Sequence, residues 1–289
     1  MNLSTVFAKM AMLILIMLLG YLCARIGITG PEFNKRVTPL MVTVLMPATI
    51  LNSVLGAPAF QAIEIVDYIL VLTVMVALQM LPAWLLPRLT TAFGNVGFVG
   101  LPVVAAIFGE EMVFFASLCN IPFNLALYSS SASQLSPEGG RVRWQDVLNA
   151  PVIATLLSIA LLLTHVPVPG VIADTISAVS GVTIPLSMIV IGTSLGAISV
   201  RAALTDWRAY AVAAVRLLVC PLLTWAVLRP FVSGDLLGIP VLLAACPTAM
   251  LVTALCLQYD RSDAFASKCI FINTILSAAT IPLVIWLLF

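Results

Sequence analysis

Long apolar runs, separated by short polar or proline- and glycine-rich breaks, make up most of the chain. Each run approaches the ~20 residues that an α-helix needs to cross a bilayer, so the pattern predicts ten membrane-spanning helices. The expected spans are 5–25, 38–57, 65–86, 89–108, 112–131, 147–165, 171–199, 208–229, 236–258 and 264–288. Only Pro82, Pro87 and Arg88 separate the third span from the fourth, so a nine-span chain in which these two fuse is the alternative.

The composition makes lipid the expected solvent for most of this sequence. Of 289 residues, 62% are hydrophobic and 9% are charged, whereas a soluble domain has about 25% charged residues. A net charge of +1 provides no basic field for nucleic acid. The six cysteines include no Cys-x-x-Cys pair, so we expect no disulfide framework and no metal site.

Lysine and arginine are distributed unevenly between the predicted loops. Ten of the thirteen follow odd-numbered spans, and two belong to the N-terminus and to the loops after even-numbered spans. Cytoplasmic loops carry the excess of basic residues, so we expect a multi-pass protein of the inner (plasma) membrane with both termini extracytoplasmic. The apolar N-terminal run has no basic segment before it and no cleavage site, and is expected to be a retained first span.

A polar segment, SPEGGRVRWQD at 136–146, divides the chain nearly in half and is expected to be a cytoplasmic linker between 1–135 and 147–289. At an offset of 150 residues, Phe115–Cys119 aligns with Phe265–Cys269, sharing four of five residues. A repeat of five spans is odd, so its second copy would enter the membrane inverted, an arrangement known in secondary transporters. The sequence therefore predicts an all-α integral membrane protein of two inverted five-helix repeats.

The fourth span contains residues that disfavour a continuous helix. Gly94, Gly97, Gly100 and Pro102 fall within nine residues, around the polar Asn95. Interrupted backbone at membrane depth is tolerated only where protein or a water-filled cavity satisfies it. This segment is therefore predicted to be a broken helix.

The ninth span has a matching interruption at Cys246, Pro247 and Thr248, and Pro247 falls opposite Gly97 at the offset of 150. Interrupted spans at corresponding places in two halves indicate a transport site. The half-helix N-termini would offer N–H groups to an anion, with Asn95 and Thr248 adding side-chain hydrogen bonds. The alternative is that glycine and proline merely permit close helix packing.

Three further polar residues inside predicted spans are candidates for substrate binding. Asn52, in the second span, either joins helices or touches substrate. Asn124 shares one face of the fifth span with Asn120. Arg216 lies well inside the eighth span, where a charge is costly and often functional. It would balance an anionic substrate or, alternatively, extend to the interface or pair with an acid.

The sequence resembles the auxin efflux carrier family. The resemblance is carried chiefly by FGNVGFVGLPVVAAIFGEE (93–111), which is close to that family's Gly-Asn-x-Gly-Phe-x-Gly-x-Pro pattern, and supported by 20–51, 149–163, 184–196 and the turn at 258–263. It implies a fold like that of bile-acid symporters and sodium/proton antiporters. Spans 1, 2, 6 and 7 would form a scaffold, and spans 3, 4, 5, 8, 9 and 10 a transport domain in which helices 4 and 9 cross at their breaks.

The resemblance also implies a substrate class and a set of site residues. Family substrates are organic anions, such as auxins and bacterial dicarboxylates. The implied site residues are Asn95, Gly97, Pro102, Cys246, Pro247 and Thr248, with Asn52 facing them from the scaffold.

A secondary transporter of a small organic anion, working by alternating access, is therefore expected. The alternative is a membrane sensor of the same fold that binds ligand without moving it. No motif for a nucleotide or for intramembrane proteolysis is present, so no enzyme is expected. We expect no cofactor; proton or sodium coupling stays open, and the resemblance allows a homodimer.

Overall fold

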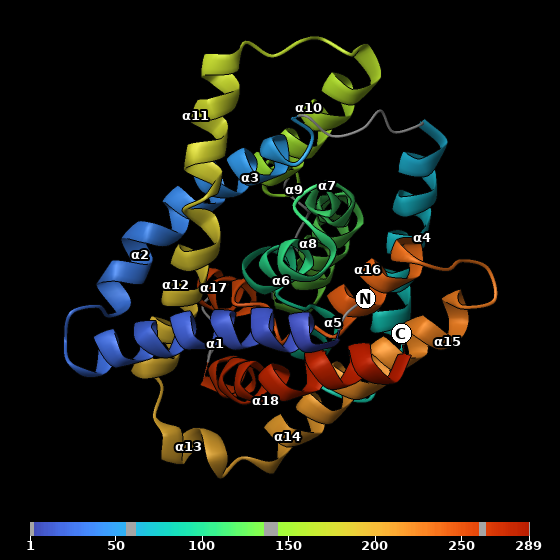
Figure 1. Ribbon diagram of the computed structural model, residues 1–289. Helices are drawn as coiled ribbons and strands as arrows, with labels where there is room; N and C mark the ends of the chain where they lie inside the picture. Colours follow the sequence, from blue (N-terminus) through green and yellow to red (C-terminus); the bar gives the residue numbers. More distant parts are fainter. Residues whose placement is uncertain (1–2, 56–61, 136–143, 260–263, 289) are drawn as a thin grey trace. The chain divides into compact units, whose positions relative to one another are not determined.

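A computed structural model describes residues 3–55, 62–135, 144–259 and 264–288 (Figure 1). In these ranges every regular element is a helix, and the only β-type pairing is one isolated bridge. The predicted linker 136–146 lies outside the described residues except for its last three. The all-helical class expected from the sequence is confirmed.

In the first half of the chain, helical elements occupy most of the first five predicted spans, and α2 lies largely in the predicted loop before the second span. Their bounds are α1 Leu3–Arg25, α2 Pro31–Leu40, η1 Met41–Leu45, α3 Met46–Asn52, α4 Ala62–Met80, η2 Pro82–Trp84, α5 Arg88–Ala92, η3 Val96–Gly100, α6 Leu101–Phe108, α7 Met112–Ser117 and α8 Asn120–Leu135. The short turn η2 and the bend after it separate α4 from α5, so these two segments are not one continuous helix.

The second half follows the remaining predicted spans. Its elements are α9 Trp144–Val147, α10 Ala150–Thr164, α11 Gly170–Ser180, α12 Thr183–Ala197, α13 Val200–Leu204, α14 Trp207–Ala214, η4 Val215–Val219, α15 Cys220–Leu228, α16 Asp235–Ala244, α17 Leu251–Gln258 and α18 Ala264–Leu288. The seventh span, expected as one helix, is divided between α11 and α12 at Gly181 and Val182.

Six helical segments among the described residues are long and apolar enough to cross a membrane. They are Phe7–Arg25, Ile63–Trp84, Met112–Leu135, Gly170–Ala197, Trp207–Leu228 and Ala264–Leu288. Three apolar helices are shorter: Val96–Phe108, Ala150–Thr164 and Asp235–Ala244. Two of these three adjoin the predicted breaks, which accounts for their length.

Each of the three π-helical turns in the described residues is followed by a proline. The turns η1, η3 and η4 end two residues before Pro47, Pro102 and Pro221. Proline has no N–H, and its ring clashes with the carbonyl four residues earlier. Widening the preceding turn relieves this clash while the helix continues.

The chain divides into two compact units. Unit 1 contains 1–69, 97–120 and 148–197, and unit 2 contains 70–96, 121–147 and 198–289.

In unit 1, α1 packs along α12 (Figure 1). Glycines permit this contact: a Cβ on Gly192 would lie 2.7 Å from the Tyr21 backbone N and against the Met17 carbonyl, and one on Gly20 would lie 2.7 Å from the Ile189 Cα. A third glycine, Gly196, faces Ala24. Because small residues let helix backbones approach closely, these positions fix the α1–α12 pair.

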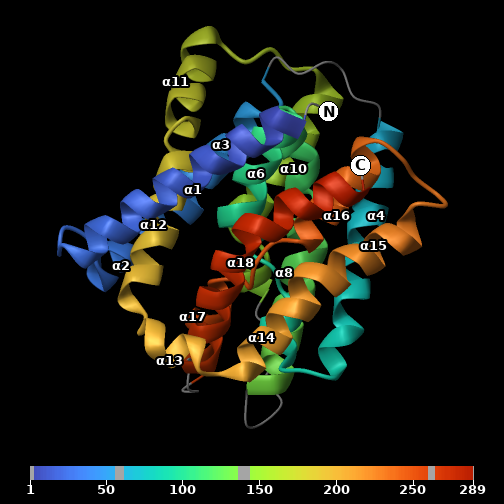
Figure 2. The same ribbon diagram turned by 60° about the horizontal axis from the view of Figure 1, so that its bottom comes forward.

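In unit 2, α15 lies beside α16, and α14 packs against α18 (Figure 2). The last helix, α18, also contacts α13 and η4. Together these helices surround the break between α16 and α17, where Cys246 and Thr248 are fully buried.

Candidate functional site

The two segments in which the sequence predicted breaks are interrupted and joined to each other in unit 2. The chain is extended at Phe93, after α5, and α16 ends at Ala244. Gly94 and Thr248 form an antiparallel bridge. The Asn95 N–H donates to the Pro247 carbonyl at 2.6 Å, and the Ala249 N–H donates to the Phe93 carbonyl at 2.9 Å. These bonds satisfy backbone groups that the interrupted helices release.

Arg216 binds the backbone at the ends of both interrupted helices. Its side chain is fully buried on η4. Nη1 donates to the Ala92 carbonyl at 3.0 Å, Nε to the Cys246 carbonyl at 2.9 Å, and Nη2 to the Leu243 carbonyl at 3.4 Å. The Gln79 Oε1 accepts a further bond from Nη1. The planar guanidinium, with five donors, suits several acceptors at once.

The electrostatics of Arg216 follow from the direction of these helices. Ala92 is the last residue of α5, and Leu243 belongs to the last turn of α16. The negative ends of both helix dipoles point at the guanidinium. A cation at the carboxyl-terminal end of a helix is stabilising. These four acceptors, three backbone carbonyl oxygens and one amide oxygen, are themselves uncharged.

The backbone at Gly94 lies directly against this guanidinium. A Cβ at that position would clash with Nη2 and lie 2.8 Å from Cζ and 3.2 Å from the Cys246 carbonyl O. Any side chain at position 94 would therefore push Arg216 away from the break.

A chain of side-chain hydrogen bonds supports the second break. The Thr248 hydroxyl donates to the Thr90 carbonyl at 2.8 Å and accepts from Asn273 Nδ2 at 2.6 Å. Thr248 and Asn273 are both fully buried. Asn273 Oδ1 accepts no hydrogen bond from the described residues. Thr248 is thus already engaged by α5 and α18 through these bonds.

Asn124 belongs to the same unit and is buried on α8. Its neighbour Phe123 meets Phe93 edge to face, with ring centroids 5.5 Å apart. This contact packs α8 against the first break. Unit 2 therefore contains seven of the ten residues expected at the site: Gly94, Asn95, Asn124, Arg216, Cys246, Pro247 and Thr248.

The other three residues, Asn52, Gly97 and Pro102, belong to unit 1. A Cβ on Gly97 would lie 3.0 Å from the Met46 Cε. The Asn52 Nδ2 donates to the Glu110 Oε2 at 3.4 Å. Asn52 and Glu110 line a cavity of about 200 Å³ in this unit.

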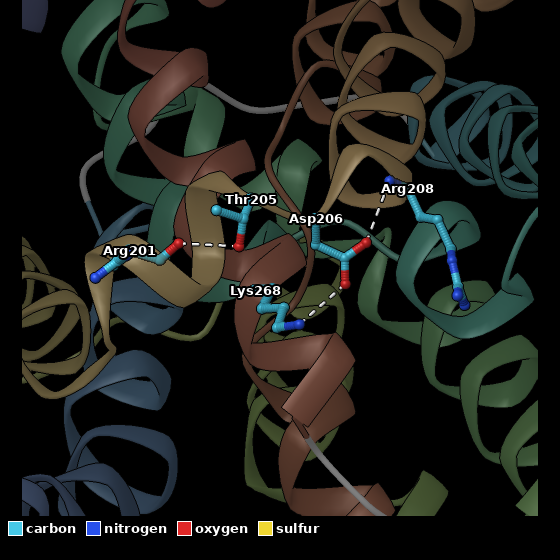
Figure 3. A network of polar contacts seen from close by, with 5 residues as sticks. All are labelled: Arg201, Thr205, Asp206, Arg208 and Lys268. Carbon is cyan, nitrogen blue, oxygen red and sulfur yellow. Dashed lines mark hydrogen bonds and ion pairs between the residues drawn. The ribbon is translucent and has the colours of Figure 1, made fainter.

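An ion pair lies at the start of α14 in unit 2 (Figure 3). The Lys268 Nζ is 3.0 Å from the Asp206 Oδ2, and the Arg208 backbone N–H donates to the Asp206 Oδ1 at 3.3 Å. The hydrogen bond from Lys268 holds the pKa of Asp206 below its ordinary value. Asp206 therefore caps α14 and joins it to α18, while the Arg208 side chain extends away.

Sequence reasoning did not identify Gln79, Thr90 or Glu110 as part of these arrangements. Gln79 is the most informative omission, because it is a buried polar residue inside the third predicted span. A buried amide needs a hydrogen-bond partner, so the position of Gln79 inside a span already indicated that it has such a partner. Thr90 contributes through its backbone carbonyl, which no side-chain pattern reveals.

Helices long enough to cross a membrane, together with two interrupted segments joined by backbone bonds, define a membrane transport protein. The family model described as "Membrane transport protein" matches residues 5–141 and 139–285. The chain belongs to this family, which is the auxin efflux carrier family that its motifs resemble. Members of the family are transporters and not enzymes.

Two relatives align over nearly their whole length. An uncharacterized transporter of Methanothermobacter thermautotrophicus is 29% identical over 289 residues, covering 93% of this chain and 94% of the relative. An uncharacterized transporter of Methanocaldococcus jannaschii is 24% identical over 299 residues, covering 95% and 96%. Both names agree with a multi-pass membrane transporter.

Proposed function

We propose that the protein is a secondary transporter of a small organic anion and works by alternating access. The observation that carries the proposal is the buried Arg216 beside two interrupted helices. We assign its positive charge to stabilising an anion through space. Charged groups inside membrane segments are costly and are commonly retained for transport.

The side chain we assign to direct binding is that of Asn95. It directly follows Gly94 at the break, and its backbone N–H is already fixed to Pro247. Thr248 is assigned to shaping the break, since its hydroxyl is bound by Thr90 and Asn273. The break also precedes α17, whose amino-terminal dipole end favours a carboxylate.

The proposed motion moves spans 3, 4, 5, 8, 9 and 10 against a scaffold of spans 1, 2, 6 and 7, with ten spans in two inverted repeats. Support comes from unit 1, which contains spans 1, 2, 6 and most of 7, and from unit 2, which contains spans 8, 9 and 10. Unit 1 also includes 97–120, from the fourth and fifth spans. We further propose an inner-membrane location and a homodimer.

The substitution Asn95→Ala tests the proposed site. Alanine keeps the backbone hydrogen bond to Pro247 and removes the amide, so substrate binding should fall at least tenfold while thermal stability changes little. Binding is measured by thermal shift of purified protein with a panel of mono- and dicarboxylates. Uptake of the stabilising anions into liposomes is then measured with wild type and variant.

Asn120→Ala is the matched control, because Asn120 is also a buried amide, and its Nδ2 has no acceptor among the described residues. This variant should bind as wild type does. Wild-type protein that binds and moves no carboxylate in the panel would overturn the proposed function. Unfolding of Asn95→Ala, without a selective loss of binding, would show instead that the break serves packing.

A further inference from the structure

We propose that a polar cavity within unit 1 binds a small monovalent cation through the Glu110 carboxylate. The cavity has a volume of about 200 Å³. Its polar lining comes from Thr49 and Asn52 on α3, Glu110 before α7, and Ser177 and Ser180 on α11. The proposal goes beyond anion transport and does not depend on the identity of the anion.

The donor set of the cavity is made of oxygen atoms. One carboxylate, one amide and three hydroxyls face it, and hard cations prefer carboxylate, carbonyl and hydroxyl oxygens. A water molecule in liquid occupies about 30 Å³, so the volume holds a cation with part of its hydration shell. It also accommodates a small primary ammonium, which carries the same charge.

The charge of the lining favours a cation over an anion. Glu110 contributes a negative charge, and none of the described residues that line the cavity is basic. An anion would meet the carboxylate with no opposite charge to offset the repulsion. A single carboxylate matches one positive charge, so the proposal is restricted to monovalent cations.

Hydrogen bonds orient the oxygens toward acceptor roles. Asn52 donates through Nδ2 to Glu110 Oε2 at 3.4 Å, which leaves Oδ1 as an acceptor. The Ser180 hydroxyl donates to Thr49 Oγ1 at 3.4 Å, and the Thr49 hydroxyl donates to Thr183 Oγ1 at 2.7 Å. A hydroxyl that has given its hydrogen to a neighbour keeps lone pairs for a cation.

A bound cation would connect segments that are distant in the sequence. Asn52 and Glu110 are 58 residues apart, and Ser180 and Thr49 are 131 residues apart. Coordination by both sets ties α3 and α11 to the turn between α6 and α7. Cation binding should therefore stabilise unit 1 against thermal unfolding.

The test compares thermal unfolding of the purified full-length protein at constant ionic strength. The salts are the chlorides of sodium, potassium, methylammonium and N-methylglucamine, the last being too large for the cavity. At a cation concentration about ten times Kd, the midpoint should rise by about 3–6 °C over N-methylglucamine. Sodium against methylammonium distinguishes a metal ion from an organic ammonium as the preferred occupant.

Glu110→Gln keeps the shape of the side chain and removes its charge, so it should lose this rise and weaken cation binding at least tenfold in calorimetry. Glu111→Gln is the matched control, because Glu111 is adjacent, is an exposed carboxylate as Glu110 is, and does not line the cavity. It should keep the rise. Equal midpoints of wild type in all four salts, an unchanged rise in Glu110→Gln, or an equal loss in both variants would overturn the proposal. Anion transport is measured separately, so its failure leaves this result unaffected.

Discussion

Arg216 is the residue on which the carbonyls of both breaks converge. A helix ends with carbonyls that lack an intrahelical partner, and at these breaks the residues that carry them are buried. The Arg216 side chain, with five N–H donors, donates hydrogen bonds to the carbonyls of Ala92, Leu243 and Cys246. A buried charge thereby becomes tolerable, because each of these oxygens replaces part of its hydration.

Arg216→Lys should destabilise the protein although it retains the positive charge. The ammonium is compact and cannot reach acceptors on both breaks at once. Each carbonyl left unsatisfied costs about 1–3 kcal/mol, so the thermal midpoint in detergent should fall clearly. Arg229→Lys is the control, since Arg229 is exposed and stacks on Trp225 at 4.6 Å. Equal midpoints for wild type and Arg216→Lys would contradict this role of the guanidinium.

At the scale of the element, proline and glycine determine how the helices bend and how closely they pack. The π-turns before Pro47, Pro102 and Pro221 let the helices continue although each proline lacks a backbone N–H. Gly192 and Gly20 permit backbone contact between α12 and α1. Because dispersion contacts drive helix association in lipid, this close approach is a main source of stability for the pair.

Gly192→Ala should weaken the α1–α12 pair. The added Cβ would meet the Met17 carbonyl and the Tyr21 backbone N, and backbone atoms cannot rotate aside. Overpacking of this kind costs about 1–3 kcal/mol, which thermal unfolding would register. Gly170→Ala is the control, because a Cβ there meets nothing within 4 Å. If Gly192→Ala were as stable as Gly170→Ala, α1 and α12 would not be held together by this contact.

At the scale of the whole molecule, the uneven distribution of lysine and arginine is the basis for the predicted orientation. Ten basic residues follow odd-numbered spans, and two belong to the opposite side. This bias depends on the alternation of ten spans. Orientation and span number can therefore be tested by one measurement of which loops face each side.

Single cysteines introduced at His165 and Arg201, in a cysteine-free variant, test the topology. His165 is the last residue of the sixth predicted span and should react with an impermeant maleimide in intact cells. Arg201 follows the seventh span and should react only after permeabilisation. Ser4→Cys, near the N-terminus, should behave as His165→Cys does. Labelling of the Arg201 position from outside would contradict the orientation.

Much of the architecture was accessible from the sequence because it depends on local properties. The length of apolar runs identified the helical segments, and Gly94, Pro102 and Pro247 identified the interruptions. The partners of Arg216 were not accessible, since three of its acceptors are backbone carbonyls from 27 to 124 residues away. The pairing of Asn52 with Glu110 was missed for the same reason.

The sequence by itself determined that the chain is an all-helical membrane protein with two interrupted segments. Hydrophobicity and the backbone limits of glycine and proline act within a few residues, so they can be recognised without a fold. Only the tertiary structure decided what satisfies those interruptions and which oxygens surround the unit 1 cavity. Hydrogen bonds between distant residues depend on how helices pack, and packing in an almost uniformly apolar chain is set by contacts that its hydrophobic pattern does not encode.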